Sequence, residues 1–401
     1  MDIVIIGGGA SGLVAAITAS KNKNNKVTLI EKNQTLGKKI LATGNGKCNY
    51  YNSDQNISHY NSTNTNLIKE IITNENLKEI DEFFSKLGII PKIKNGYYYY
   101  PFSNQATTIK NALVREVEKN TKVLLETTVE KIDKGKNKFI IKTNNGVIEC
   151  DKVIIATGSK ASPKTGSTGE GYKFLKDFNH TIIEVLPALV QLKTKGNFLK
   201  DWSGIRTDVE VYLYINNKNI KSDQGEIQLT NYGVSGICIF NLSRFVPIAL
   251  KQNNKVEIKI NFLPFTSEPE EFLKDLNNNN SINDILEGIL NNKLVSVILN
   301  KSSINKNKKY NELSSKEKEI LIENLTNFTL EVIGTNSYEE CQVCSGGVPL
   351  TEINTKTMES KIINNLHIVG ELLDVDGDCG GYNLTFAWIT GLLAGKSDLN
   401  D

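Results

Sequence analysis

Three glycines near the N-terminus have the spacing of a phosphate-binding turn. Gly7, Gly9 and Gly12 follow the β-branched run Ile3–Ile6 and precede Leu13–Ser20, a run of small and apolar residues typical of a closely packed helix. The first glycine permits a tight turn, the second lets a pyrophosphate approach the backbone, and the third lets the helix pack close to the strand. Free N–H groups and the dipole at a helix N-terminus attract phosphate. We therefore expect a dinucleotide pyrophosphate at Gly7, Gly9, Ala10, Ser11 and Gly12.

An acidic residue lies where the ribose of such a dinucleotide would be held. Glu31 follows the expected strand Val27–Ile30 and lies 19 residues after Gly12, close to the spacing of about 20 residues that is typical of dinucleotide-binding βαβ units. Its carboxylate can accept hydrogen bonds from ribose hydroxyls, which favours a free 2′-OH over a 2′-phosphate. Strand, turn, helix and acid in register predict a bound nucleotide rather than an empty glycine turn.

Later glycine turns favour FAD over NAD. A second turn ends the expected strand Lys152–Ala156, and a third ends Leu366–Val369 and is followed by acidic residues that suit the hydroxyls of a ribityl chain. The helix that begins after these acids has a dipole that can stabilise negative charge on the N1–C2=O side of a reduced flavin. We therefore predict non-covalent FAD, held in these turns by Ala156, Thr157, Gly158, Gly370, Glu371, Asp374, Gly380, Gly381, Tyr382 and Asn383.

A second dinucleotide domain is not expected. Residues 190–340 contain no further strand–GxGxxG–helix pattern, and the glycines at Gly166–Gly171 have the wrong spacing and follow no obvious strand. A nicotinamide that reduces the flavin must then visit it transiently, so we expect NAD(P)H as a transient reductant at most.

Composition excludes several classes of protein. The chain has 401 residues, 39% hydrophobic and 23% charged, with a net charge of +2, which fits a globular protein and not a disordered chain, a collagen or a dedicated nucleic-acid binder. No apolar run reaches the roughly 18 residues that a membrane span needs. The first expected strand begins at Asp2, which leaves no room for a signal peptide, and six scattered cysteines suit reduced thiols. We expect a cytoplasmic protein.

Changes in residue pattern predict the domain organisation. Strand–glycine signals at both ends of the chain indicate one α/β sheet with a large insertion, whose first part alternates as strands do and whose second part is helical. We predict a Rossmann-type FAD-binding domain with an inserted β-rich domain and a smaller helical domain. The expected boundaries are 1–188 and 362–401 for the FAD-binding domain, 189–264 and 333–361 for the β domain, and 265–332 for the helical insertion.

The sequence resembles the BaiN/YhiN (HI-type) family of bacterial NAD(P)/FAD-dependent oxidoreductases. The matching stretches are Val4–Ala16, Glu31–Asn49, Ala156–Tyr172, Pro187–Val190, Cys344–Val348, Thr357–Lys361 and Gly370–Gly395. The resemblance covers almost the whole chain and implies the same three-part architecture. It departs from the family at Lys47, where an arginine is usual, and at Thr230–Ile237, where a histidine is missing. We place further cofactor contacts at Lys32, Lys39, Gly44, Asn45, Gly46, Cys48, Asn49 and Val129.

The family resemblance implies reduction of an activated C=C bond by hydride transfer from reduced flavin. The candidate substrates are uridine in ribosomal RNA, giving dihydrouridine, and a steroid-type enone. The alternative is a flavin-dependent oxidase of a small amine such as aminoacetone; a nucleotide-binding protein without turnover is a third reading. The partner is thus a small molecule or structured RNA, for which Lys193, Lys195, Lys200 and Lys301–Lys309 could supply a basic face. The sequence does not indicate the oligomeric state.

Completion of C=C reduction requires a proton, and few titratable side chains fall inside the flavin-face motifs. Cys379 and Cys48 are the predicted donors, with Tyr382 in reserve. Cys341 and Cys344 have CxxC spacing but lack the second pair of a structural zinc site, so we expect no metal. His59, His180 and His367 show no ligand spacing and are expected to be structural or exposed.

Overall fold

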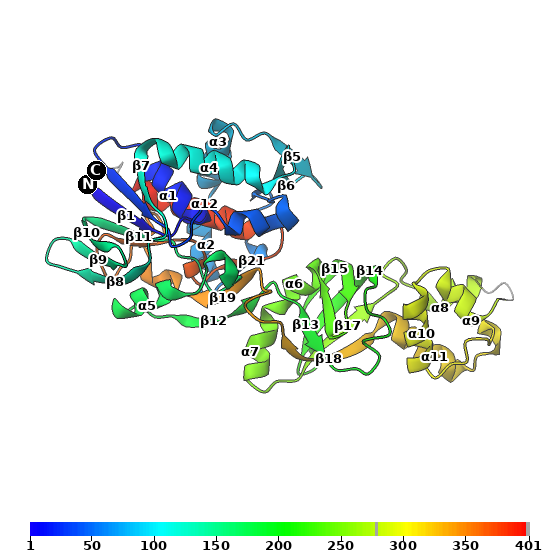
Figure 1. Ribbon diagram of the computed structural model, residues 1–401. Helices are drawn as coiled ribbons and strands as arrows, with labels where there is room; N and C mark the ends of the chain where they lie inside the picture. The colour runs from blue at the N-terminus through cyan, green and yellow to red at the C-terminus, as the bar shows by residue number, and fades with distance from the viewer. Residues whose placement is uncertain (277–279, 398–401) are drawn as a thin grey trace. The chain divides into compact units, whose positions relative to one another are not determined.

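The computed structural model describes residues 1–276 and 280–397 and divides into two units (Figure 1). The first unit comprises Met1–Leu186 and Gln342–Asp401, and the second comprises Pro187–Cys341. The second unit is therefore an insertion in the chain of the first. Each unit is described by itself below.

The first unit is built on a parallel sheet. Its strand order is β20 (Leu366–Ile368), β11 (Lys152–Ile155), β1 (Asp2–Ile6), β2 (Lys26–Ile30) and β7 (Thr121–Leu124), and every neighbouring pair is parallel. The central strands are buried, as expected for β-branched runs covered on both faces. Strands far apart in the sequence thus end at the same edge, and the predicted Rossmann-type α/β fold is confirmed.

Two helices pack on this sheet with their backbones in close contact. They are α1 (Ala10–Ala19) and α12 (Tyr382–Lys396), which lie side by side in Figure 1. A Cβ atom at Gly391 would lie 2.3 Å from the carbonyl oxygen of Ser11, and one at Gly395 would lie 2.7 Å from that of Ala15. Glycine at both positions therefore sets the distance between the two helices.

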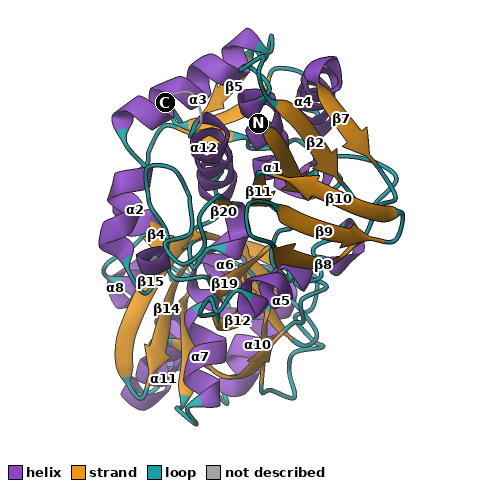
Figure 2. Cartoon of the chain, turned by 90° about the vertical axis from the view of Figure 1, so that its left-hand side faces the viewer, coloured by secondary structure: helices purple, strands orange, loops and turns teal. Residues whose placement is uncertain are grey.

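A three-stranded antiparallel sheet lies beside the parallel one in Figure 2. It consists of β8 (Val129–Lys134), β9 (Phe139–Thr143) and β10 (Gly146–Cys150), and it leads directly into β11. A small three-stranded sheet has the order β3 (Tyr51–Asn52), β6 (Tyr98–Pro101) and β5 (Pro91–Lys94). Two strand pairs are β4 (Tyr60–Asn61) with β21 (Asp376–Gly377) and β12 (Ile183–Ala188) with β19 (Val343–Gly347). The remaining α-helices of the unit are α2 (Thr65–Ile71), α3 (Asn74–Lys86), α4 (Ala106–Asn120) and α5 (Glu170–Asp177).

The second unit is a closed barrel with helices packed on it. The barrel order is β13 (Leu192–Thr194), β16 (Gly233–Gly236), β15 (Lys218–Leu229), β14 (Arg206–Ile215), β17 (Val256–Asn261) and β18 (Phe328–Thr335). The helices are α6 (Ile237–Ser243), α7 (Phe245–Lys251), α8 (Pro269–Asp275), α9 (Ile282–Glu287), α10 (Asn292–Lys301) and α11 (Ser315–Thr326). Barrel and helices share one apolar core that includes Trp202, Phe262 and Phe328. This is the β-rich insertion with a helical part that the sequence predicts.

The chain returns to the first unit at Gln342, whereas the sequence predicts that the β domain continues through residues 333–361. Strand β18 ends at Thr335 and the second unit ends at Cys341. The next strand, β19, pairs with β12 instead of joining the barrel. Strand-like residues alone do not show which sheet a strand joins, because that choice depends on partners far away in the sequence.

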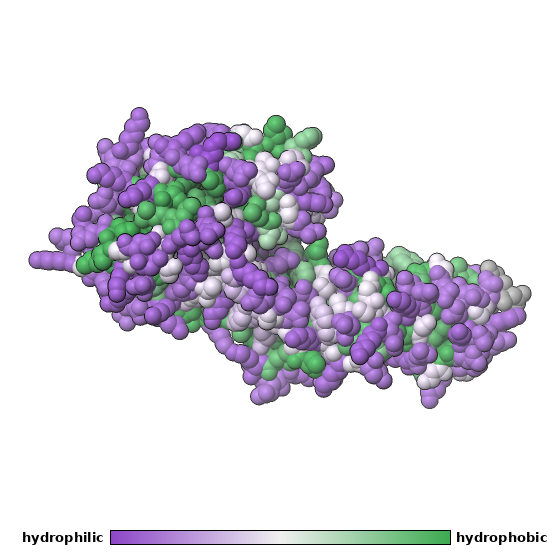
Figure 3. Space-filling model, viewed as in Figure 1, coloured by the Kyte–Doolittle hydropathy of each residue, from purple (hydrophilic) through white to green (hydrophobic). Residues whose placement is uncertain are grey.

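Polar side chains cover most of the visible face of the molecule (Figure 3). Apolar areas interrupt this surface, and the exposed apolar side chains include Ile90, Ile93 and Phe102, in and next to β5 and β6. Among residues 1–276 and 280–397, none of the helices has both the length and the apolar character that crossing a membrane requires.

The first prediction concerns Gly391. Gly391→Ala should destabilise the protein by about 1–3 kcal/mol, because the new methyl group overlaps the Ser11 carbonyl oxygen in a tightly packed contact. Helix propensity alone favours alanine over glycine by about 1 kcal/mol, so the steric effect must outweigh it. Urea unfolding measures the difference. Gly334→Ala is the control, since a Cβ there meets no atom of the described residues within 4 Å; an unchanged or raised midpoint for Gly391→Ala would contradict the packing argument.

Candidate functional site

The glycine turn between β1 and α1 is shaped by contacts with the backbone. Gly7 has φ +106°, and a Cβ atom on it would lie 2.5 Å from the carbonyl oxygen of Ala156. At Gly12 a Cβ would lie 1.9 Å from the carbonyl oxygen of Gly7. Gly9 differs, because no atom of the described residues lies within 4 Å of its Cβ position. The open space thus lies at Gly9, in front of the α1 N-terminus, where a phosphate fits.

Glu31 is already bound to this turn. It lies at the end of β2 and is buried, and its Oε2 accepts a hydrogen bond from the Gly8 N–H at 2.8 Å. Its Oε1 accepts from the Asn33 N–H at 2.8 Å and from the Asn33 amide at 2.7 Å. A carboxylate has about four acceptor positions, so about one remains for a ribose hydroxyl. Nearby, the Thr127 N–H donates to the Glu31 carbonyl oxygen, which brings Val129 at the start of β8 to this end of the sheet.

Two lysines from the predicted cofactor set are paired with carboxylates. Lys32 Nζ lies 2.7 Å from Glu170 Oε2, and Lys39 Nζ lies 2.7 Å from Glu371 Oε2. Glu371 also accepts from the Cys344 N–H through Oε1, at 3.0 Å. The structure therefore brings Lys39 and Glu371, two predicted cofactor residues, to each other. Their charges balance, and the pair joins the loop after β2 to the loop after β20.

Five buried side-chain oxygen atoms of the first unit have no hydrogen-bond partner among the described residues: Thr18 Oγ1, Asn49 Oδ1, Thr121 Oγ1, Thr157 Oγ1 and Thr385 Oγ1. An unsatisfied buried polar group costs about 1–3 kcal/mol, so each calls for a partner such as a ligand. Asn49 and Thr157 belong to the predicted cofactor set. Asn49 Oδ1 lies 3.2 Å from the Cβ position of Gly381. Two segments distant in sequence therefore meet at this oxygen, which is one of the atoms without a partner. The oxygens of Asn49 and Thr157 and the space at Gly9 fit a bound dinucleotide.

The loop that carries Gly44, Asn45, Gly46 and Cys48 has an unusual backbone. All four residues have positive φ, between +53° and +79°, and the Cys48 N–H donates to the Thr43 carbonyl oxygen at 3.0 Å. The Cys48 side chain is fully buried, and burial raises the pKa of its thiol to about 12. Cys48 therefore stays protonated at neutral pH and gives up its proton poorly.

Polar residues after β20 are engaged by their neighbours. Asp374 Oδ2 accepts from the Thr63 N–H at 2.8 Å and from the Thr63 hydroxyl at 2.7 Å, and the side chain is buried. Asn383 accepts from the Gly377 N–H at 2.9 Å and donates to the Gly377 carbonyl oxygen at 2.8 Å. Asp374 and Asn383 thus hold the loop that leads into α12.

The start of α12 places an aromatic ring against a histidine. Gly380 and Gly381 have φ of +131° and +92°, and Gly381 caps the helix. The next residue, Tyr382, is buried and stacks on His59, with 4.6 Å between ring centroids and 19° between ring planes. Burial raises the pKa of the Tyr382 hydroxyl well above its ordinary value, and the carboxylates of Asp54 and Asp378 add to this.

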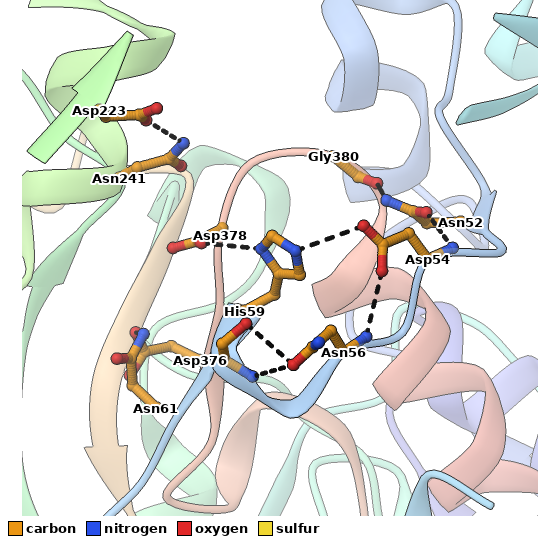
Figure 4. A network of polar contacts seen from close by, with 12 residues as sticks. Asn52, Asp54, Asn56, His59, Asn61, Asp223, Asn241, Asp376, Asp378 and Gly380 are labelled. Carbon is orange, nitrogen blue, oxygen red and sulfur yellow. Dashed lines mark hydrogen bonds and ion pairs between the residues drawn. The ribbon is translucent and has the colours of Figure 1, made fainter. Parts of the chain in front are cut away.

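His59 is the functional candidate that the sequence reasoning missed. Its ring lies between two carboxylates, with Nδ1 3.2 Å from Asp378 Oδ2 and Nε2 3.5 Å from Asp54 Oδ2 (Figure 4). His59 and Asp378 are 319 positions apart in the sequence, so no local spacing reveals the pair. The acid-rich sequence around Asp376 and Asp378 was the available signal.

The other two histidines are structural, as predicted. His180 bonds to Glu352 at 2.6 Å and to Ser360 at 2.8 Å. This resembles a Ser-His-Glu arrangement, but the Ser360 hydroxyl is buried and also accepts from the Ile362 and Ile363 N–H groups, so it is not available as a nucleophile. His367 is buried, and burial lowers its pKa to about 3. Within residues 1–276 and 280–397 there is no group of three or more His, Cys, Asp or Glu that could hold a metal ion.

Comparisons with known proteins agree with one another. A sequence model described as "HI0933-like protein Rossmann domain" matches residues 1–397. The chain is 37% identical over 403 aligned positions to "3-dehydro-bile acid delta(4,6)-reductase" of Clostridium scindens, covering 98% of each chain. It is 29% and 28% identical to proteins named "Ribosomal RNA dihydrouridine synthase" from Haemophilus influenzae and Escherichia coli, covering 96% of this chain and 95% of each relative. The predicted family is thus shown over the whole chain.

The second prediction follows from cysteine burial. Of the six cysteines, all within the described residues, only Cys379 is not buried. Because alkylation requires an accessible thiolate, iodoacetamide at pH 8 should modify Cys379 first and leave Cys48, with its thiol pKa of about 12, unmodified in the folded protein. Mass spectrometry of peptides reads this out, with urea-unfolded protein as the control. Early labelling of Cys48 would contradict its placement.

Proposed function

Because this chain belongs to the HI0933-like Rossmann-domain family, we propose that it is an FAD-dependent oxidoreductase that reduces a C=C bond conjugated to a carbonyl, as in a steroid-type enone. The observation that carries this proposal is the 37% identity, over nearly the full length of both chains, to a relative named as a bile acid reductase. The relatives named as dihydrouridine synthases have lower identity, but reduction of uridine to dihydrouridine also saturates a C=C bond next to a carbonyl.

The cofactor site of this proposal lies along the carboxyl edge of the parallel sheet. The turn from Gly7 to Gly12 holds the pyrophosphate, and Glu31 uses its remaining acceptor position for the ribose. Thr157 and Asn49 offer their unpaired oxygens to the flavin half of the molecule. The remaining predicted contacts, from the 44–49 loop to Asn383, stay predictions of the same site.

Bound FAD in its reduced form supplies a hydride to the electron-poor carbon of the substrate. The start of α12 directs its N–H groups and the positive end of its dipole to the site, which favours negative charge there. The proposed electron donor is a nicotinamide that visits the flavin transiently. A resident one is not expected, because the described part of the second unit is a closed barrel with helices and has no parallel sheet that could hold a second dinucleotide. A cytoplasmic location stays a prediction.

The second candidate is uridine in ribosomal RNA, favoured by the names of two relatives. Several lysines that were expected to form a basic face have partners. Lys195 pairs with Glu331, Lys308 Nζ lies 2.8 Å from Glu317, and Lys301 Nζ lies 3.7 Å from the Phe328 ring centroid. Paired lysines neutralise fewer phosphates, so these contacts support the small enone over RNA.

The third prediction tests the ribose contact. Glu31→Gln should weaken FAD binding by about 0.5–2 kcal/mol, because a charge-assisted hydrogen bond to ribose, worth about 1.5–3 kcal/mol, becomes a neutral one worth about 1 kcal/mol. Fluorescence titration of the apoprotein with FAD measures the dissociation constant. Glu149→Gln, at an exposed glutamate of the same unit, is the control and should bind as the wild type does; equal affinity for both variants would remove Glu31 from the site.

The fourth prediction tests the reaction. Enzyme reduced without oxygen should be reoxidised rapidly by a steroid-type 4-en-3-one, more slowly by uridine-containing ribosomal RNA, and not by aminoacetone, which has no C=C bond to accept a hydride. Stopped-flow absorbance of the flavin reports the rates, and mass spectrometry should find a product two hydrogens heavier. Oxidised enzyme reduced by aminoacetone, followed by rapid reaction with oxygen, would instead establish the amine oxidase.

A further inference from the structure

The position of His59 is fixed by backbone contacts on both sides. It precedes β4, which pairs with β21 through Asn61 opposite Asp376 and Tyr60 opposite Gly377. The Asp378 N–H donates to the His59 carbonyl oxygen at 2.9 Å. The imidazole is therefore held beside the turn that leads into α12, where our proposed function places the flavin.

The two edges of the imidazole differ. Nδ1 contacts Asp378, whose side chain is 12% exposed, whereas Nε2 faces Asp54, whose side chain is 46% exposed. The 3.5 Å distance from Nε2 to Asp54 is an ion-pair distance, longer than a normal hydrogen bond. Asp378 and the stacked Tyr382 ring thus orient the imidazole, and its Nε2 edge faces the more exposed Asp54 (Figure 4).

The turn beside His59 is tied to the same segment. The Asn52 side chain donates to the Gly380 carbonyl oxygen at 2.8 Å and accepts from the Asp54 N–H at 2.8 Å. Residues 52–59 therefore hold both Asp54 and the Gly380 turn. A proton donor carried by this segment keeps a fixed position relative to the start of α12.

Two of the three donors expected from the sequence, Cys48 and Tyr382, suit proton transfer less well. Cys48 is fully buried with a pKa of about 12, and the pKa of Tyr382 is raised by burial. Both groups hold their protons at neutral pH, and general acids are most effective when they release a proton near the working pH. Imidazole is the side chain most often used for such transfers.

We propose that His59 is the proton donor of the C=C reduction, oriented by Asp378 and recharged through Asp54. This inference rests on the proposed function. Hydride addition to the β-carbon of the enone moves the electron pair of the double bond to the α-carbon and carbonyl as an enolate. The α-carbon takes the proton from Nε2, a C–H bond forms and the N–H bond breaks. The imidazolium thereby becomes a neutral imidazole, which regains one H⁺ from the bulk solvent by way of the exposed Asp54 carboxyl group, and NAD(P)H restores the two electrons to the flavin.

The test compares His59→Gln with Ser58→Ala, a change at the exposed neighbouring residue. Ser58→Ala should keep the melting temperature of the wild type, and both variants should keep its FAD affinity and dithionite reduction, because neither residue belongs to the predicted FAD contacts. In protein labelled with ¹⁵N-histidine, which has only three histidines, the signal that disappears in His59→Gln should show a protonated Nδ1 in the wild type and shift in Asp378→Asn. An unprotonated Nδ1 would overturn the orientation by Asp378.

The rate measurement completes the test. Reoxidation of reduced His59→Gln by the enone should be slower by about 10²–10⁴-fold, with Ser58→Ala unchanged, and added imidazole should restore part of the rate in His59→Ala. Equal rates for His59→Gln and Ser58→Ala would overturn the proposal while leaving the reductase function intact. If the reduced wild type reacts with neither the enone nor ribosomal RNA, the proposed function fails, and this inference fails with it.

Discussion

The close approach of α1 to its surroundings is the constraint on which the rest of the first unit depends. Its N-terminus sits against the β1 and β11 ends, where Gly12 comes within 1.9 Å, by its Cβ position, of the Gly7 carbonyl oxygen. Its side contacts α12 at Gly391. Any side chain at these glycines would push the helix away from the sheet or from α12. Helix α1 therefore fixes the position of the phosphate-binding turn and also the position of α12.

Polar links across long sequence distances complete what this packing begins. Lys39 and Glu371 join the loops after β2 and β20, and Asp374 holds Thr63. Asn52 holds the Gly380 turn. Because Asp374 and Asn52 are buried and Lys39 and Glu371 are half-buried, the loss of a partner leaves a desolvated polar group, which costs more than the bond itself contributes. The network thus adds polar contacts between the loops around the site to the apolar packing.

The sequence predicts the parts of the fold that depend on local residue patterns. The β1–α1–β2 unit could be found because strand, glycine turn and helix follow one another within residues 2–30, and the comparisons confirm the family. The contacts of Lys39 and His59 could not be found in this way, since their partners Glu371 and Asp378 lie more than 300 positions away. For the same reason, the sequence pattern predicts the return of the chain to the first unit at residue 362, whereas it occurs at Gln342. Local propensity does not show which of two sheets a strand joins.

The distribution of charge around the start of α12 has a chemical consequence. Lys39 neutralises the charge of Glu371, and the Thr63 N–H and hydroxyl donate to Asp374, so the Glu371 carboxylate does not oppose the negative charge that a reduced flavin would carry. Of the other carboxylates, Asp54 and Asp378 contact His59, and Asp376 accepts from the Asn61 amide at 3.4 Å. Acidic residues that would otherwise repel an anion are thus bonded to a lysine, a hydroxyl group, an amide or an imidazole. An acid-rich loop beside an anionic cofactor is tolerable only with such pairing, and the same contacts orient the imidazole of His59.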